Sequence, residues 1–376
     1  MANPDKQSER GRRRPAWLLP TPTRRDDSDS PVRSLLVRLM RGEDLSRADA
    51  ATLFGAAMDE RATDAQIGAA LVALAVKGET VDELTGMAEA MRARAVRIQC
   101  RHERFIDTAG TGSSDAKTFN VSTAAAFVCA GAGLPVAKHG SKAATSLSGS
   151  ADVLTELGVN VQVDASVSER CLNEIGICFL FAPLYHQATA RVAQIRCQLG
   201  VHTTFNLLGP LTNPAGAPRQ IIGVWHETLL EPLAHTLAAL GTEHGWVVHG
   251  SDGLDEVTTT GLTTVAEARG GEVRVFTISP QAFGLTTCAG LEELRGGSAR
   301  ENADLIRAVF RGETQGRVAA ARDLIVANAA AALYVGGSEE DLHDAAKRAE
   351  VSVQSGAALE KLEELSRLTN IEVAKA

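Results

Sequence analysis

Apolar residues recur every three or four positions along residues 34–96. The recurring positions include Leu35, Leu36, Leu39, Ala51, Leu53, Phe54, Ala57, Ile67, Ala70, Leu71 and Leu74. Apolar side chains at this spacing share one face of an α-helix. The segment therefore predicts a series of short amphipathic helices.

Three of these helices have recognisable first turns. In each, a hydroxyl residue precedes the apolar pattern and an acidic or amide residue follows three positions later, as in a capping box. The pairs are Ser46 with Asp49, Thr63 with Gln66, and Thr80 with Glu83. Connections as short as Gly78–Glu79 make the helices antiparallel neighbours. Residues 31–100 are thus predicted to form a small helical domain, to which a later helical segment can contribute.

The pattern changes after Asp107, where short apolar runs alternate with helical segments. Candidate strands are 134–138, 179–182, 220–224, 246–250 and 273–278. Candidate helices are 121–132, 149–158, 227–241 and 317–334, and further helices extend to residue 368. Alternation at this spacing is typical of an α/β sheet covered by helices. Residues 101–376 are predicted to form this α/β domain.

Composition narrows the range of functions. The 376 residues carry a net charge of -8, which disfavours a general nucleic-acid-binding protein. No stretch reaches the roughly 20 apolar residues of a membrane span, so no membrane association is expected. The six cysteines form no CxxC pair and predict free thiols, with the cytoplasm as compartment. Residues 1–30 lack an apolar pattern and predict a disordered extension, whose basic GRRRP segment could meet an anionic partner.

The first stretch with candidate chemistry is DTAGTGSSDAKTFNVST, residues 107–123. Gly110 and Gly112 permit unusual backbone angles and let an anion approach the main chain. The N–H groups at the start of the following helix would then point at that anion. Hydroxyl donors are available from Thr111, Ser113, Ser114, Thr118, Ser122 and Thr123. A phosphate-binding loop and a plain connecting loop both fit these residues, and neither a Walker loop nor GxGxxG is present.

A second stretch, AKHGSKAATSLSGSAD, covers residues 137–152. Lys138 and His139 follow an apolar run and so fall at the C-terminal end of a predicted strand, where ligands bind in open α/β sheets. Lys142 adds charge, and Ser146, Ser148 and Ser150 add hydroxyls before a helix. Two such loops suit a ligand with two separate phosphate groups, whereas the alternative is a flexible surface turn.

Two further stretches supply an acidic loop and two arginines. In HGSDGLDEVT, residues 249–258, Asp252, Asp255 and Glu256 place three carboxylates within five positions. Carboxylates on a loop suit Mg²⁺, although acidic turns are also common on protein surfaces. In residues 190–216, Arg191 and Arg196 lie on a predicted helix. An arginine facing a cleft could clamp a carboxylate, and a surface salt bridge is the better interpretation for Arg191.

Together these stretches resemble the anthranilate phosphoribosyltransferase family. The resemblance rests on GTGSSDAKTFNVST, KHGSK…SGSADVLTELG, R-CQLGVHTTFNLLGPLTNPAG and DGLDE, and it covers about residues 33–370 in order. It implies a nucleoside phosphorylase/phosphoribosyltransferase-like fold and a homodimer with the active site at the hinge between the two domains. It also implies Mg²⁺-dependent transfer of a phosphoribosyl group from phosphoribosyl pyrophosphate to the amine of anthranilate, in tryptophan synthesis.

The resemblance also assigns roles by motif. Contacts to pyrophosphate and sugar are implied for Gly110, Thr118, Asn120, Ser122, Thr123, Lys138 and Ser150, and the wider substrate set adds Ser113, Ser114, Ser141, Lys142 and Ser146. Ser122, Asp255 and Glu256 match the metal positions. Gly110, His139 and Arg196 match the acceptor side, with Arg196 as the carboxylate clamp. Lys138, Arg196, Asp255 and Glu256 are the predicted catalytic residues, and no general base is assigned because an aromatic amine is already unprotonated.

Departures from the family pattern leave the acceptor open. The family's first loop usually reads GTGGD, whereas this chain has Ser113 and Ser114 at the last two positions, so a carboxylate is missing. Ser141 and Lys142 replace the asparagine and arginine of KHGNR, and His202 stands where many relatives carry arginine. A transferase for another aminobenzoate is therefore the main alternative. A pyrimidine-nucleoside phosphorylase would not need the acidic loop, and a non-enzymatic nucleic-acid-binding relative conflicts with the acidic charge balance.

Overall fold

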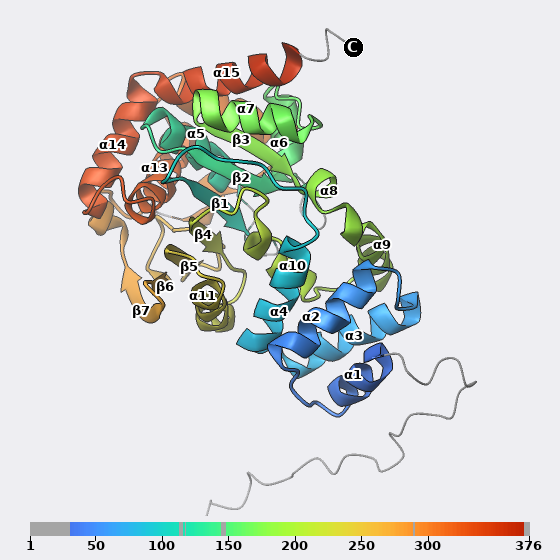
Figure 1. Cartoon of the computed structure of the whole chain (residues 1–376). Coiled ribbons are helices and arrows are strands. Elements are labelled where there is room, and N and C mark those ends of the chain that lie inside the picture. The colour runs from blue at the N-terminus through green and yellow to red at the C-terminus, as the bar shows by residue number, and fades with distance from the viewer. Residues whose placement is uncertain (1–30, 113–115, 117, 144–147, 289, 372–376) are drawn as a thin grey trace, which may run out of the picture.

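The computed structural model describes residues 31–112, 116, 118–143, 148–288 and 290–371. A group of N-terminal helices lies beside a larger body in which helices cover a sheet (Figure 1). The predicted disordered extension, residues 1–30, lies outside the described residues. The predicted fold class, a small helical part and an α/β part, is confirmed.

The N-terminal helices form where the apolar period predicts them. They are α1 (Pro31–Met40), α2 (Arg47–Met58), α3 (Asp64–Lys77) and α4 (Val81–Arg92). The capping boxes begun by Thr63 and Thr80 are complete, with both reciprocal hydrogen bonds. Ser46 accepts a hydrogen bond from the backbone N–H of Asp49, and the Asp49 carboxylate accepts a hydrogen bond from Arg38 at 2.8 Å.

A later segment completes the helical part. Helices α8 (Ala182–Tyr185), α9 (Ala190–Leu199) and α10 (Phe205–Leu208) follow the third strand of the sheet. Helix α9 packs against α2 and α3, and α10 packs against α4. Phe54 of α2 and Phe205 of α10 stack with their ring centroids 4.8 Å apart. Arg196 is therefore carried on a helix that belongs to the helical part in space.

The described strands form one seven-stranded sheet in the order β3-β2-β1-β4-β5-β6-β7. They are β1 (Ile106–Gly110), β2 (Val136–Gly140), β3 (Ile177–Phe181), β4 (Arg219–Gly223), β5 (His244–Gly250), β6 (Thr263–Arg269) and β7 (Glu272–Ile278). The pairs from β3 to β5 are parallel, and β6 and β7 are antiparallel additions. The chain adds strands on one side of β1 and then returns to its other side, so the order reverses between β1 and β4.

Strands β1 and β6 were missing from the sequence prediction because they bury polar residues. Asp107 in β1 is fully buried, and its carboxylate accepts hydrogen bonds from the backbone N–H of His139 and from Asn213 Nδ2 at 2.8 Å. Glu267 in β6 is 2% exposed and accepts from His244 and from Trp246 Nε1 at 2.9 Å. A buried carboxylate is tolerated when such partners satisfy it.

Helices cover both faces of the sheet. They are α5 (Val121–Gly131), α6 (Ser150–Glu156), α7 (Ala165–Ile175), α11 (Leu230–Ala239), α12 (Ala299–Phe310), α13 (Arg317–Val335), α14 (Leu342–Gln354) and α15 (Ala357–Ile371). Helices α5 and α13 pack together against the central strands, and α14 and α15 lie outside them (Figure 1). Helix α11 packs on β5, β6 and α4, so it joins the opposite face of the sheet to the helical part.

Helix α13 is the one described helix that is long and apolar enough to cross a membrane by length and composition alone. Two-thirds of its apolar window, 67%, is buried inside the fold. Its side chains from Ala329 to Leu333 are fully buried against α5 and the sheet. The helix is therefore the central core helix of the α/β part.

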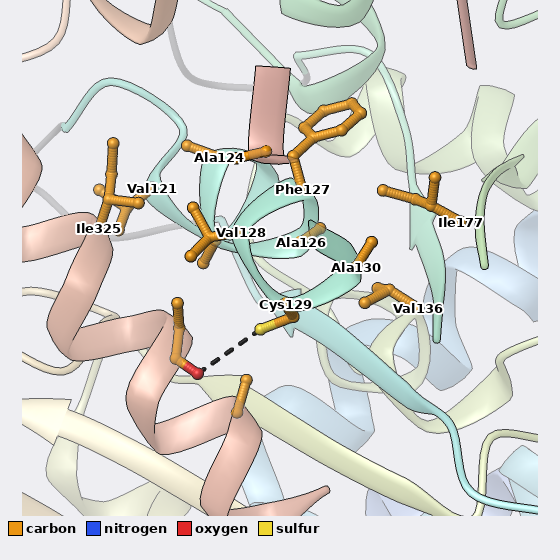
Figure 2. Packing of buried hydrophobic residues seen from close by; sticks show 14 of the residues in the cluster. Val121, Ala124, Ala126, Phe127, Val128, Cys129, Ala130, Val136, Ile177 and Ile325 are labelled. Carbon is orange, nitrogen blue, oxygen red and sulfur yellow. Dashed lines mark hydrogen bonds between the residues drawn. The ribbon is translucent and has the colours of Figure 1, made fainter. Parts of the chain in front are cut away.

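Figure 2 shows how closely α5 fits into this core. Val121 and Val128 face α13, where Ile325 lies opposite, and the Cys129 thiol donates to the Ala329 carbonyl at 3.5 Å. Phe127 is 1% exposed, and its ring meets Phe310 of α12 edge to face at 6.1 Å between centroids. This packing fixes the first turn of α5, which lies at the cavity described below.

Removing the Phe127 ring is expected to destabilise the fold strongly. A cavity left by Phe127→Ala in close-packed surroundings lowers the free energy of unfolding by about 3–5 kcal/mol. Urea denaturation followed by circular dichroism measures this loss. Val351→Ala, which changes a side chain that is 61% exposed, serves as the control and is expected to stay within about 0.5 kcal/mol of the wild type. Equal effects of the two substitutions would contradict the packing shown in Figure 2.

Candidate functional site

A cavity of about 450 Å³ lies between the C-terminal ends of the central strands and the helical part. Loops after β1, β2 and β5 form one wall, and α9, α10 and Met91 of α4 contribute the other. The order of strands reverses beside β1, and ligands of open α/β sheets bind at such a point. The fold therefore places the four motif stretches around one hollow.

The loop after β1 is held against β4 and against the acidic loop. The Thr111 hydroxyl and backbone N–H both donate to the Gly223 carbonyl, and the Gly112 N–H donates to Asp255 Oδ2 at 3.2 Å. Gly110 and Thr118 line the cavity. The predicted contacts Ser113 and Ser114 lie outside the described residues.

Lys138 lies at the centre of the cavity wall. It is carried by β2 and is 4% exposed, and its ammonium donates to the Thr108 carbonyl and to Ser122 Oγ, the latter at 3.3 Å. Burial lowers its pKa, whereas the nearby charges of Asp107 and Glu256 oppose this shift. An ammonium has three N–H donors, and these described partners accept from two of them.

The loop after β2 is closed by an aspartate that was not assigned a role from the sequence. Asp152 Oδ2 accepts hydrogen bonds from the backbone N–H groups of Ala143 and Gly149, at 3.0 and 2.9 Å. The Ser150 hydroxyl donates to the Ser141 carbonyl at 3.3 Å. Ser141, Lys142 and Ser150 all line the cavity, with the first two exposed, and Ser146 lies outside the described residues.

The three carboxylates of the acidic loop have two different roles. Asp252 accepts hydrogen bonds from Thr258, Thr260 and the Leu254 N–H, so it holds the turn. Asp255 and Glu256 line the cavity. A Cβ on Gly223 would lie 1.7 Å from the Asp255 carbonyl, so only glycine at the end of β4 lets this loop approach so closely.

Asp255 and Glu256 form a site that fits a hard cation. Glu256 Oε1 accepts from the Ser122 N–H at 3.2 Å, and the Ser122 hydroxyl lies beside Lys138. Burial and the adjacent Asp255 carboxylate raise the pKa of Glu256 well above its usual value. Among the described residues, no three His, Cys, Asp or Glu side chains gather closely enough to hold a metal. Mg²⁺, which takes one or two carboxylates and completes its shell with water and phosphate, suits this donor set.

Arg196 faces the cavity from the helical side. Its Nη2 donates to Asn206 Oδ1 at 3.2 Å, and its guanidinium lies over the Phe205 ring, 5.2 Å from the centroid. Burial lowers its pKa, but a guanidinium remains charged in proteins. Arg191, five residues earlier, points away and forms a salt bridge with Asp64 at 2.6 Å. As the sequence predicted, Arg191 forms a surface salt bridge, whereas Arg196 lines the cavity.

Two buried histidines line the same cavity as Arg196. His139 Nδ1 lies 3.1 Å from the Gly209 carbonyl and donates to it, and the His139 and His186 rings are 5.1 Å apart. Burial lowers the pKa of His139 to about 3 and that of His186 to about 4. Both rings are therefore neutral at physiological pH and present polar but uncharged surface to a ligand.

These histidines predict how stability depends on pH. In the unfolded chain each ring binds a proton near pH 6.5, whereas the folded chain keeps both neutral down to about pH 4. The unfolded state thus binds more protons in this window, so stability falls as the pH falls. Between pH 7 and pH 5 the loss is about 2 kcal/mol per histidine.

Urea denaturation at pH 7 and pH 5 measures the effect. The double variant His139→Gln/His186→Gln is expected to lose markedly less stability than the wild type over this interval. Burial raises the pKa of Asp107 to about 6, which acts in the opposite direction but is common to both proteins. The same pH dependence in both proteins would contradict the assignment of neutral, buried rings.

Several buried polar atoms at the cavity have no hydrogen-bond partner among the residues that the structure describes. They are Thr123 Oγ1, His139 Nε2 and Arg196 Nε. Buried polar atoms without partners are rare in folded proteins, because each costs free energy. Several such atoms line this one cavity, which indicates that a polar ligand forms hydrogen bonds with them.

Sequence reasoning missed several residues of this site. His186, Gly296, Gly297 and Asn302 line the cavity but carried no assignment. Gly296, Gly297 and Asn302 belong to a segment about 180 residues after the first loop, and no short-range signal connects the two. His202 had been noted as a departure, yet it is exposed beside Trp225 and is not among the described residues that line the cavity.

Family models match both parts of the chain. One, described as "Glycosyl transferase family, a/b domain", matches residues 102–359, and another, "Glycosyl transferase family, helical bundle domain", matches residues 33–95. An anthranilate phosphoribosyltransferase from Anaeromyxobacter dehalogenans is 50% identical over 340 residues, which are 90% of this chain and 99% of that protein.

Solved structures agree with these matches. The anthranilate phosphoribosyltransferase of Thermus thermophilus has a TM-score of 0.83 at 37% identity, covering 89% of this chain and 99% of the other. That of Saccharomyces cerevisiae in complex with PRPP and Mg has a TM-score of 0.81 at 29% identity, covering 91% and 99%.

Proposed function

Because this chain belongs to the anthranilate phosphoribosyltransferase family, we propose that it transfers a phosphoribosyl group from phosphoribosyl pyrophosphate to the amine of anthranilate. The bond between the sugar C1 and pyrophosphate breaks, and a bond from the amine nitrogen to C1 forms. Pyrophosphate leaves with the bonding electrons, and the amine proton passes to solvent. The single observation that carries the proposal for these residues is the cavity in which all four motif stretches meet.

The chain's own groups are proposed to stabilise the leaving charge. Lys138 supplies a buried ammonium, and Thr118, Ser122, Thr123 and Ser150 supply hydroxyls around it. Such donors act strongly because the buried site excludes water and fixes them in advance. Asn120, at the start of α5, lines the same cavity.

A magnesium ion is proposed to be held by Asp255 and Glu256, with Ser122 nearby. When bound, Mg²⁺ neutralises the negative charge that develops on pyrophosphate. Burial and, to a smaller extent, the adjacent Asp255 carboxylate raise the pKa of Glu256. A bound cation would favour the charged form of both side chains, which supports the assignment.

The acceptor is proposed to bind between the phosphate loops and α9. Arg196 clamps the carboxylate of the aminobenzoate, and neutral His139 and Gly110 line the side on which its ring enters. Fixing the amine against C1 lowers the barrier by positioning, since the two reactants no longer need to meet by chance. An aromatic amine is unprotonated at neutral pH, so no general base is assigned.

The direct test mixes the purified protein with Mg²⁺, phosphoribosyl pyrophosphate and anthranilate. Loss of anthranilate fluorescence together with release of pyrophosphate is the expected result. The same assay is repeated with other aminobenzoates, because Ser141 is shorter than the family's asparagine and is exposed at the cavity. Pyrophosphate release with another aminobenzoate, and none with anthranilate, would show that anthranilate is not the acceptor. The proposed type of reaction, phosphoribosyl transfer, would be retained.

We also propose a homodimer in the cytoplasm. Met40 of α1 and Val72 and Val76 of α3 are 53%, 40% and 81% exposed on the helical part, where apolar side chains favour association. All six cysteines are free, which suits a reducing compartment. Light scattering after size-exclusion chromatography measures the mass in solution, and a monomer at micromolar concentration would contradict the dimer.

A further inference from the structure

A closed network of three side chains lies beside the cavity and joins three separate segments. The Asn302 side chain from α12 donates through Nδ2 to Asn120 Oδ1 at 3.0 Å and to Ser148 Oγ at 3.3 Å. Ser148 Oγ donates to Asn120 Oδ1 at 2.8 Å, and Asn120 Nδ2 donates to the Ser148 carbonyl at 3.2 Å. Asn120 follows the first loop, Ser148 ends the second loop, and Asn302 lies in the first turn of α12.

Two backbone groups fix the direction of every hydrogen bond in this network. The Gly297 N–H donates to Asn302 Oδ1 at 2.7 Å, so the other end of that amide must be the NH₂ group. The Ser148 carbonyl can only accept, so Asn120 must present its NH₂ group to it. Both amides are therefore oriented without ambiguity, and the Ser148 hydroxyl completes the circuit.

The Asn120 side chain takes part in this network instead of capping α5. It is the N-cap residue of α5, yet its side chain makes no capping hydrogen bond, although asparagine is among the best capping residues. Its backbone is left-handed, with φ 65°, which a residue other than glycine rarely adopts. The missing cap hydrogen bond and the left-handed backbone are consistent with a side chain that contacts Ser148 and Asn302 instead of its own helix.

The segment before α12 is packed against the first loop. Thr118 and Arg295 form an antiparallel backbone bridge, and a Cβ on Gly296 would lie 2.2 Å from the Thr118 carbonyl. Gly296, Gly297 and Asn302 also line the cavity. Asn302 is 2% exposed, so its amide is fully committed to the network.

We propose that Asn302 is a positioning residue for the phosphoribosyl pyrophosphate site, which sets the two phosphate-binding loops relative to each other. Its side chain contacts Asn120 and Ser148 and acts through them. The inference rests on the proposed function, because that function requires the protein to bind phosphoribosyl pyrophosphate. Substitution of Asn302 is therefore expected to weaken the binding of phosphoribosyl pyrophosphate selectively. Arg196 and the other residues on the acceptor side are expected to keep their arrangement.

The decisive substitutions are Asn302→Asp and Asn302→Ala. Aspartate has the same size but presents an oxygen to Asn120 Oδ1, so the network cannot close. Each variant is expected to raise the KM for phosphoribosyl pyrophosphate by about tenfold or more, with the KM for anthranilate within about twofold of the wild type. Ser352→Ala is the matched control, because it removes another buried hydrogen bond, to the Val128 carbonyl at 2.8 Å, far from the cavity.

A double-mutant cycle with Ser148→Ala tests whether the network acts as a unit. Once Asn302 is alanine, the second substitution is expected to add little to the KM for phosphoribosyl pyrophosphate. Full additivity would overturn the network. An unchanged KM in both Asn302 variants, or an equal rise in both KM values accompanied by lowered thermal stability, would overturn the positioning role.

Calorimetric titration of Mg²⁺–phosphoribosyl pyrophosphate separates this inference from the proposed function. If the wild type binds the compound but does not consume anthranilate, the acceptor assignment fails, and weaker binding by the Asn302 variants still supports the positioning role. If the wild type turns over normally and the variants bind equally well, only the role of Asn302 is overturned. If the wild type does not bind the compound at all, both are overturned.

Discussion

Asp255→Asn is expected to lower kcat/KM for phosphoribosyl pyrophosphate by about two to three orders of magnitude. The substitution keeps the size of the side chain, and an amide oxygen can still accept from the Gly112 N–H, as Asp255 Oδ2 does at 3.2 Å. The backbone at this position is held by its close approach to Gly223, so the loop keeps its course. What is lost is one of the two negative charges proposed to hold Mg²⁺.

The assay for this variant follows anthranilate fluorescence over a range of Mg²⁺ concentrations. The deficit is expected to shrink in part at high Mg²⁺, because weaker binding of the ion can be offset by its concentration. Asp344→Asn is the control, since its carboxylate is exposed on α14 and pairs only with Lys347 among its described contacts. Wild-type kcat/KM for Asp255→Asn at every Mg²⁺ concentration would reject the proposed metal role.

Arg196→Ala is expected to raise the KM for anthranilate by about a hundredfold or more, because the two hydrogen bonds proposed to hold the acceptor's carboxylate are lost. Arg196→Lys keeps the charge but cannot form the planar, two-pronged contact with a carboxylate. It also loses the contact of the guanidinium with the Phe205 ring, so lysine is expected to restore only a small part of the affinity. The KM for phosphoribosyl pyrophosphate is expected to change little in either variant.

Arg191→Ala provides the matched comparison on the same helix. Its guanidinium is partly exposed and pairs with Asp64, so its removal is expected to leave both KM values near those of the wild type. Steady-state kinetics with each substrate varied in turn makes the distinction. A comparable rise in the KM for anthranilate in Arg191→Ala would show that the effect arises from general charge and not from a clamp at Arg196.

Much of the helical architecture followed from local chemistry. The capping boxes at Thr63 and Thr80 form as predicted, because their partners are three residues away. The predicted helix 317–334 is observed as Arg317–Val335. The family resemblance, read from four motifs, is confirmed by the matches to both parts of the chain.

Tertiary structure decided which side chains of each motif face the cavity. Asp252 and Asp255 are three residues apart, yet Thr258 and Thr260 bind the first while the second faces the cavity. Strands β1 and β6 were unpredictable from their own residues, because the groups that satisfy Asp107 and Glu267 are distant along the chain or arrive through strand pairing.

The sequence by itself indicated many of the helices, five of the seven described strands, the family and the four loops proposed to carry the chemistry, because each depends on residues within a few positions of one another. Only the tertiary structure brought Asn302 to Asn120, 182 residues earlier, and His186 to His139. Such pairs leave no periodic or short-range signal. Their hydrogen bonds and ring contacts become possible only after the sheet has set the order in which its loops meet.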